Sequence, residues 1–226
     1  MSEKIILIAD PKILAIKVID NKEPLIDLRD QQEIVFGPSP EIPNNTDYTY
    51  LRNAVYDKLK QAQALLPSGL RFCLYEGYRS LALQKMLFDE RFEKIKKQHF
   101  TWSPEDIFLE TIRMISPIIN QDGSANIPPH ATGGAIDVYL INDVGGDVAM
   151  GIHPKDWMQD FDGVVSQTLS STISTEEKHN RKIMCDVLSA VGFVNYPTEY
   201  WHWSYGDRYW AYHKNEKHAI YGICQH

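Results

Sequence analysis

Apolar residues recur every three or four positions in several stretches of the chain, and this spacing predicts helices. The clearest helical stretches are 51–66 and 79–98. Residues 103–106 (Ser-Pro-Glu-Asp) predict a further helix start, because serine caps a helix, proline fits its first turn and acids favour its N-terminal end. Another helix is expected over 175–190, stopping at Gly192.

Strands are predicted where apolar and polar residues alternate, or where a short apolar run ends at turn residues. Pro128-Pro129 should open an extended segment, and Gly145-Gly146 should form a hairpin turn. The stretch 37–45 is rich in proline and asparagine and should be a loop. The predicted strands are 12–20, 70–75, 135–141 and the aromatic-rich block 193–212.

Helices in the first half followed by strands in the second predict an α+β fold. We expect one domain over residues 1–226, with a central antiparallel sheet and helices packed on it. The length and the 43% hydrophobic content suit a globular protein with a core. The net charge of −7 argues against nucleic acid or an anionic membrane as the main partner.

The cysteines Cys73, Cys185 and Cys224 are widely spaced and form no C-x-x-C pair. They therefore predict neither a thiolate zinc site nor a disulfide framework. Free thiols suit a reducing compartment. Because no apolar run is long enough for a signal-peptide core or a membrane span, a cytoplasmic location is expected.

Two segments carry candidate metal chemistry. His130 and Asp137 lie seven positions apart across a Gly-Gly pair, which lets the backbone turn so that both side chains reach one space. Asp137 interrupts an apolar strand, and a carboxylate there is costly unless it is paired or bound to a cation. His202 would complete a set of three ligands, and Glu199 lies close enough in sequence to handle a proton. A regular strand would place residues 199 and 202 on opposite faces, so this hypothesis requires a turn or bulge between them.

Each of these residues also has an ordinary structural interpretation. Histidines are commonly surface or core residues, and an aspartate near glycines is often a turn residue. Arg79 follows a predicted strand, where it could stabilise an oxyanion, yet it could equally form a salt bridge to Glu76. The remaining histidines are interpreted as structural or surface residues: His99, His153, His179, His213, His218 and His226.

Taken together, the segments resemble the D-alanyl-D-alanine dipeptidases, the family that includes the vancomycin-resistance dipeptidase. Its metal motif Ser-x-His-x-x-Gly-x-Ala-x-Asp is matched by residues 128–137, apart from the first position. Its Glu-x-Trp-His motif is matched by residues 199–202, and its Gly-Tyr-Arg turn by residues 77–79. The resemblance covers roughly residues 45 to 212, a range that includes the aromatic block near the C-terminus.

The resemblance implies one Zn²⁺ per chain held by His130, Asp137 and His202, with Glu199 as general base and Arg79 stabilising the transition state. It implies a small D-dipeptide, D-alanyl-D-alanine first, as substrate. A carboxylate following the metal strand would hold the substrate ammonium, and we expect Asp162, with Asp156 as the alternative.

One departure bears on specificity. Pro128 stands where the motif has serine, so a hydroxyl that helps to hold the substrate's amino end in relatives is missing. Pro128 and the long segment 143–163 leave room for a zinc D,D- or L,D-carboxypeptidase acting on a longer cell-wall peptide. Two further alternatives stay open: a zinc-stabilised binding module without turnover, and a protein without metal.

Overall fold

The computed structural model describes residues 5–224, and its central feature is a five-stranded sheet in the order β2-β4-β5-β7-β6. Strands β4, β5, β7 and β6 are antiparallel neighbours, whereas β2 joins the edge parallel to β4. A separate two-stranded ribbon pairs β1 with β3. The strands are β1 (Leu25–Asp27), β2 (Val35–Phe36), β3 (Tyr50–Arg52), β4 (Leu70–Glu76), β5 (Ala135–Asn142), β6 (Val194–Tyr196) and β7 (Glu199–Ser204).

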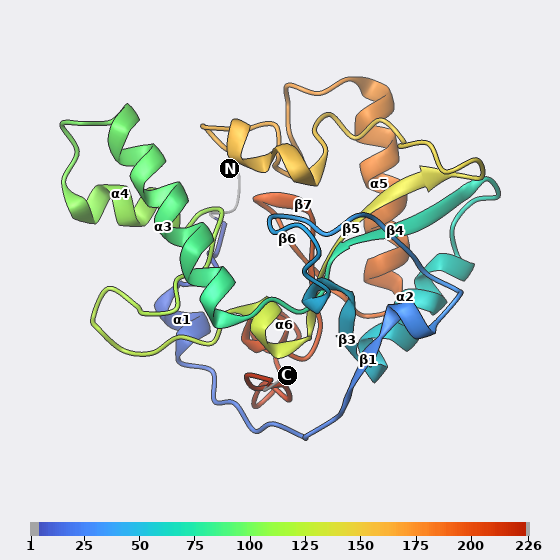
Figure 1. Ribbon diagram of the computed structural model, residues 1–226, viewed down its shortest axis with the longest axis horizontal. Helices are drawn as coiled ribbons and strands as arrows, with labels where there is room; N and C mark the ends of the chain where they lie inside the picture. Colours follow the sequence, from blue (N-terminus) through green and yellow to red (C-terminus); the bar gives the residue numbers. More distant parts are fainter. Residues whose placement is uncertain (1–4, 225–226) are drawn as a thin grey trace.

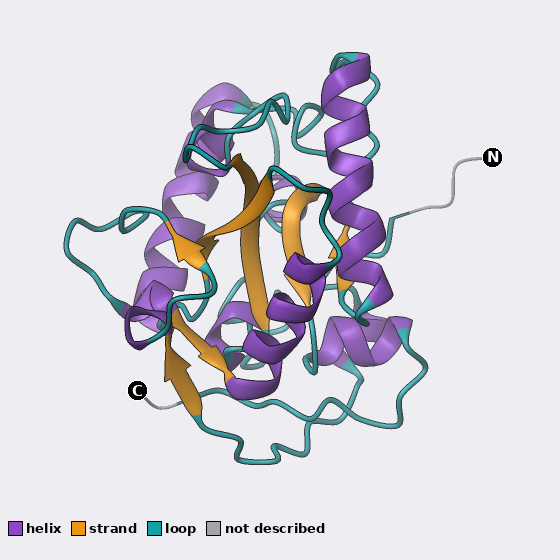
Figure 2. Ribbon diagram, turned by 90° about the vertical axis from the view of Figure 1, so that its right-hand side faces the viewer, coloured by secondary structure: helices purple, strands orange, loops and turns teal. Residues whose placement is uncertain are grey.

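Helices flank the sheet on both sides (Figure 2). Helices α2 and α5 lie together on one side of the molecule, and α3 and α4 on the other (Figure 1). The α-helices are α1 (Pro11–Leu14), α2 (Asn53–Ala64), α3 (Leu81–Gln98), α4 (Pro104–Thr111), α5 (Thr175–Ala190) and α6 (Arg208–His213). The short 3-10 helices are η1 (Leu28–Asp30), η2 (Asp47–Thr49), η3 (Pro129–Thr132) and η4 (Pro154–Gln159).

The two faces of β5 have different roles. Ile136, Val138 and Leu140 are fully buried in the main apolar cluster, which they share with side chains from α2 and α5. Burying each such side chain contributes about 1.5–3 kcal/mol. Because successive strand residues point to opposite faces, Asp137 and Tyr139 project from the other side of the sheet. The apolar face therefore anchors the strand and fixes where the carboxylate lies.

The predicted α+β class and the central sheet with helices on it are confirmed. The sheet is mixed rather than purely antiparallel, because β2 adds a parallel edge strand that the sequence pattern did not reveal. The helices predicted over 51–66, 79–98 and 175–190 and the strands over 70–75 and 135–141 all form, with small shifts at their ends. The stretch 37–45 is a loop, and the expected turn at Gly145-Gly146 closes between Asn142 and Gly146.

Three local predictions were wrong. Residues 12–20 form no strand: Asp10 caps the short helix α1 by accepting a hydrogen bond from the Lys12 amide, and only Val18 makes a β-bridge. Pro128 is extended, but the residues after it wind into η3. The aromatic block yields two strands and then α6, because the carboxylate of Asp207 caps that helix at the Trp210 amide. In each case a side-chain cap or a proline outweighs the apolar pattern.

None of the helices within residues 5–224 is long and apolar enough to cross a membrane. The expectation for His226 lies outside the described residues.

The turn after β4 requires glycine for steric reasons. A Cβ at Gly77 would lie 2.6 Å from the carbonyl oxygen of Tyr50 and 2.9 Å from that of Tyr48. We expect Gly77→Ala to lower the free energy of unfolding by about 1–3 kcal/mol, because backbone atoms must shift to admit the methyl group. Urea denaturation measures this. Gly146→Ala is the matched control, since its Cβ would meet only the side chain of Asn142; equal losses in the two variants would contradict the steric argument.

Candidate metal centre and active site

Three segments bring His130, Asp137 and His202 together. Asp137 on β5 and His202 on β7 are cross-strand partners, so their side chains leave the same face of the sheet. His130 comes from η3, just before β5, and Gly133 ends that helix with a φ of 67°, a backbone conformation that favours glycine. This reversal folds η3 back over the strand. All three side chains are buried, with at most 4% of each residue exposed.

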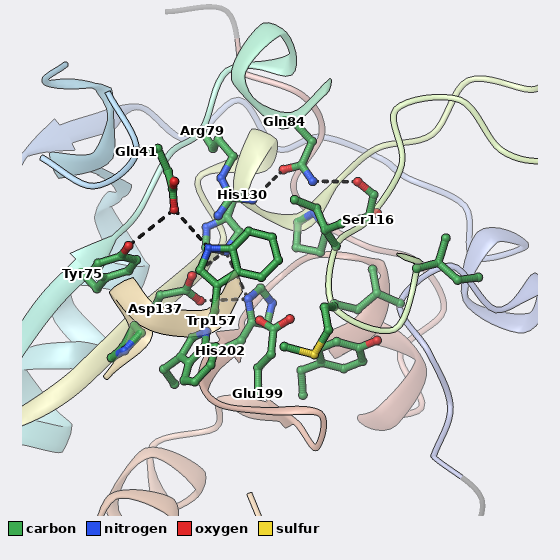
Figure 3. A pocket seen from close by; sticks show the side chains of 18 residues that line it. Glu41, Tyr75, Arg79, Gln84, Ser116, His130, Asp137, Trp157, Glu199 and His202 are labelled. Atoms are coloured by element: carbon green, nitrogen blue, oxygen red, sulfur yellow. Dashed lines mark hydrogen bonds and ion pairs between the residues drawn. The ribbon is translucent and has the colours of Figure 1, made fainter. Parts of the chain in front are cut away.

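The donor atoms of these residues converge on one point (Figure 3). Nδ1 of His202 lies 3.0 Å from Oδ1 of Asp137 and 3.1 Å from Nε2 of His130. Nε2 of His130 lies 3.4 Å from Oδ2 of Asp137. One ligand atom from each residue lies within 4.8 Å of the others, which is a separation that a single metal ion can bridge.

The hydrogen bonds around His130 fit a metal ligand. Its Nδ1 lies 2.7 Å from the carbonyl oxygen of Gly77, which can only accept, so Nδ1 carries the proton. Nε2 therefore presents a lone pair toward His202 and Asp137, as in metal-bound histidines whose other ring nitrogen donates to a carbonyl. Two nitrogens and one carboxylate oxygen that converge in this way suit zinc, which would bind in place of the contact between His202 and Asp137.

The charge state of Asp137 supports the same conclusion. Burial by itself would raise the pKa of this carboxyl, but His130 and His202 outweigh it and hold the pKa well below its usual range. Burial lowers the pKa of His202, although Asp137 opposes that shift. A carboxylate that stays ionised in this way can bind a metal ion.

Glu199 reaches the same cavity because β7 is irregular. Tyr196 of β6 pairs with Glu199, whereas the preceding Asn195 pairs with Trp203, so residues 200–202 form a bulge with no counterpart on β6. This confirms the irregularity that the metal hypothesis required, since Glu199 and His202 now both line one cavity. Burial raises the pKa of Glu199 well above its ordinary value, and the nearby charge of Asp137 adds to the effect.

Arg79 both forms the salt bridge considered above and faces the cavity. Its Nε donates to Oε1 of Glu76 at 2.9 Å, and its Nη2 donates to Oε2 of the same carboxylate. Nη1 donates to Oε1 of Gln84 at 3.0 Å. Glu76 is fully buried at the end of β4. Its pair with Arg79 therefore fixes the guanidinium in the wall of the cavity that also holds His130, Asp137 and His202 (Figure 3).

Several residues of the cavity were not identified from the sequence. Gln84 on α3 donates to the Ser116 carbonyl at 2.7 Å, and Glu41 reaches in from the loop 37–45. Trp157 of η4 also contributes to the wall. No motif marks these positions. The loop assignment for 37–45 and the helical position of Gln84 carried no information about the direction in which either side chain points.

The structure does not bring Asp162 to the cavity. Asp162 is exposed on the loop after η4, and Asp156 is half-buried, where it accepts a hydrogen bond from Gln159. Neither residue lines the cavity that holds the three candidate metal ligands. Pro128 does not line it either, while its neighbour Pro129 and the serine Ser116 do.

A buried His/Asp/His cluster beside a glutamate of raised pKa is the arrangement of a metallopeptidase site. The sequence matches the D-ala-D-ala dipeptidase family over residues 44–220. The chain belongs to this family of metallopeptidases. It is 26% identical over 232 residues to a D-alanyl-D-alanine dipeptidase of Synechocystis sp. (strain ATCC 27184 / PCC 6803 / Kazusa), covering 91% of each chain.

Solved structures similar to this chain include VanYB in complex with D-alanine-D-alanine. The match covers 91% of this chain and 93% of that one, at 15% identity and a TM-score of 0.44. A second is the vancomycin resistance D,D-pentapeptidase VanY, a variant solved in complex with Zn(II), with 91% and 95% covered, 12% identity and a TM-score of 0.42.

Removing Arg79 should destabilise the protein as well as change the cavity. Arg79→Ala leaves the carboxylate of Glu76 buried without its partner, and breaking a buried pair in this way costs about 3–5 kcal/mol. We expect Glu76→Gln combined with Arg79→Ala to recover part of that loss. Urea denaturation gives the free energies. Lys85→Ala, which breaks the exposed pair with Asp89, is the control and should cost no more than about 1 kcal/mol. A loss in Arg79→Ala as small as in the control would show that the buried pair does not stabilise the turn.

Proposed function

We propose that this protein is a zinc-dependent dipeptidase that hydrolyses a small D-amino-acid dipeptide, with D-alanyl-D-alanine as the first candidate. The observation that carries the proposal is the convergence of His130, Asp137 and His202 in a cavity that also holds Glu199. Membership of the D-Ala-D-Ala dipeptidase family supports the substrate class. Three protein ligands leave one coordination position open, which distinguishes a catalytic zinc site from a closed structural one.

The residues present fit one Zn²⁺ per chain, held by Nε2 of His130, a carboxylate oxygen of Asp137 and Nδ1 of His202. When bound, zinc lowers the pKa of a water molecule toward about 7 and polarises a carbonyl group. The hydrogen bond from His130 to the Gly77 carbonyl fixes the imidazole in the orientation that this role needs.

Glu199 is the general base of the proposed reaction. Its carboxylate accepts the proton of the attacking water and later delivers it to the amine that leaves when the peptide bond breaks. A raised pKa suits both steps, because a carboxylate with a higher pKa is a stronger base and, once protonated, an acid close to the working pH. Such proton transfer contributes about 10²–10⁴-fold to the rate.

Arg79 is the oxyanion-stabilising residue of the proposal. Glu76 and Gln84 occupy three of its five N–H groups, so the remaining two are available for the charge that develops on the substrate carbonyl oxygen. The guanidinium is held in advance and needs no rearrangement during the reaction. One such donor is worth about 3–4 kcal/mol of transition-state stabilisation.

The size of the cavity favours a small substrate over a long peptide. Its free volume is about 40 Å³, room for only a few water molecules of about 10–15 Å³ each. Pockets for drug-sized ligands usually measure about 300–1,000 Å³. A cavity of this size suits a short peptide with small side chains better than a long one.

Glu199→Gln tests the assignment of the base. The substitution keeps size and hydrogen-bonding capacity but removes the proton acceptor, so we expect kcat for D-alanyl-D-alanine to fall at least 10²-fold. Zinc content should stay near one per chain, and the midpoint of thermal unfolding should not fall. The measurement is a ninhydrin assay of released D-alanine combined with metal analysis. Turnover within a few-fold of the unsubstituted protein would exclude Glu199 as the base.

Chelation tests the metal. Removing zinc leaves mutually facing lone pairs and a buried carboxylate, so we expect a dialysed, chelator-treated protein to lose activity and to unfold at a lower temperature. Adding one equivalent of Zn²⁺ should restore both properties. In the Asp137→Asn variant, added zinc should restore neither the activity nor the unfolding temperature. Full activity after complete removal of metal would contradict the proposal.

A substrate screen separates the dipeptidase from the other functions that the sequence allows. We expect the protein to hydrolyse D-alanyl-D-alanine faster than longer peptides that end in D-alanine. Faster release of the terminal residue from a muropeptide would instead indicate a D,D- or L,D-carboxypeptidase. Stoichiometric zinc with no hydrolysis of any D-dipeptide would indicate a binding module.

A further inference from the structure

A groove separate from the metal cavity lies between the N-terminal segment and the chain around and after α4. One wall is formed by residues 5–15, which include α1, and the other by the end of α4 and the loop 120–125 (Figure 1). The groove encloses about 1250 Å³, compared with about 40 Å³ for the metal cavity. Pockets for small ligands usually measure about 300–1,000 Å³, so a chain-like ligand suits this groove better than a single small molecule.

The groove and the metal cavity share a thin partition. Leu7 and Ala9 line the groove, whereas Ile8 between them lines the metal cavity. Ile112, just after α4, lines both. The three candidate metal ligands do not line the groove, so a ligand bound there would lie behind the partition and would not contact them.

Apolar side chains cover both walls of the groove. Leu109 on α4 is 47% exposed, so a ligand in the groove would remove apolar surface from water. The large apolar residues of the lining are Ile5, Leu7, Leu14, Phe108, Leu109 and Ile112.

Arg208 brings an uncompensated positive charge to this apolar lining. Its Nε is buried without a hydrogen-bond partner, and its guanidinium pairs with no other side chain within residues 5–224. Burial lowers the pKa of Arg208, and no carboxylate offsets the effect. Arg113, the other arginine of the groove, is already paired with Glu110. A single free guanidinium matches a carboxylate, which carries one charge and fits its planar fork, better than it matches a phosphate with two charges.

An acceptor without a donor in the same groove favours a peptide over a fatty acid. Nδ2 of Asn120 donates to Oγ of Ser124 at 3.0 Å, whereas Oδ1 of Asn120 is buried and accepts no hydrogen bond. Asn120 lies in the groove wall, so a turn of its side chain presents this oxygen to a ligand. A peptide supplies N–H donors as well as a terminal carboxylate, but a fatty acid supplies only the carboxylate.

We propose that this groove binds an extended peptide with apolar side chains and a free C-terminal carboxylate, which forms charged hydrogen bonds with Arg208. The apolar side chains of the peptide lie against α4 and the N-terminal segment, and a peptide N–H donates to Asn120. The inference goes beyond the proposed function and does not depend on hydrolysis at the metal. It assigns a second binding site to the chain, on the other side of Ile8 and Ile112 from the metal ligands.

The test compares two probes, a fluorescein-labelled Leu-Ala-Leu-Ala peptide with a free C-terminus and its C-terminal amide. Fluorescence anisotropy gives Kd for each probe with the zinc-loaded protein, and chromatography afterwards verifies that the probe is intact. We expect the acid to bind about 10- to 100-fold more tightly than the amide. Arg208→Gln should remove this difference by weakening the acid alone, because it deletes the charge-assisted hydrogen bonds. The midpoint of thermal unfolding should not fall, since Arg208 has no protein partner to lose.

Arg71→Gln is the matched control for the charge. Arg71 is half-buried near the start of β4 and does not line the groove, so both affinities should stay unchanged. Leu109→Ser tests the apolar wall and should weaken the acid and the amide alike, by roughly 3- to 10-fold. Leu65→Ser is its control, because Leu65 is 54% exposed, similar to Leu109, and lies outside the groove.

Four results would overturn the inference. Absence of binding by the acid would exclude the site, and equal affinities for acid and amide, or an unchanged Kd after Arg208→Gln, would exclude a carboxylate at Arg208. Decanoate that displaces the labelled peptide as well as unlabelled peptide does would assign the groove to an apolar acid. Loss of binding after zinc removal, at a temperature where the metal-free protein stays folded, would place the peptide at the metal ligands. We expect zinc removal to leave its Kd unchanged, whether or not the protein hydrolyses D-alanyl-D-alanine.

Discussion

The burial of Asp137 inside a sheet is the constraint on which the rest of the site depends. A carboxylate that is 4% exposed in an otherwise apolar strand is costly unless charge or hydrogen bonds compensate it. The compensation comes from His202 on the neighbouring strand and His130 on the preceding turn, whose nitrogens lie 3.0 and 3.4 Å from its oxygens. Both imidazoles are themselves buried, so each of the three groups depends on the other two for its compensation.

The surrounding fold holds this set in place from several directions. The apolar face of β5 anchors the strand in the main core, and pairing with β7 determines which side His202 faces. The carbonyl of Gly77, at the end of β4, orients His130, while the buried Arg79–Glu76 pair fixes the same turn. Three parts of the chain that lie far apart in sequence, around residues 76–79, 130–137 and 199–202, thus meet at the cavity.

Much of this arrangement could be predicted from the sequence, for identifiable physical reasons. The strand face of Asp137 follows from a period of two, and the bulge between Glu199 and His202 follows from requiring both side chains in one place. The roles of the site residues remain predictions, since only their convergence is visible in the structure. The parallel edge strand β2 has two residues and leaves no periodic pattern, so nothing in the sequence indicated it.

The position of Glu41 shows where such reasoning ends. Its loop was predicted correctly, but the direction of a loop side chain depends on tertiary contacts, here with Trp157 and Tyr75. Conversely, Asp162 lies close in sequence to cavity residues and yet is exposed.

The measurement that tests the central claim most directly is anomalous scattering at the zinc absorption edge from crystals of the zinc-loaded protein. The account predicts one strong peak per chain, within bonding distance of His130 Nε2, Asp137 and His202 Nδ1. A peak elsewhere, or none at these three side chains in zinc-saturated crystals, would contradict it.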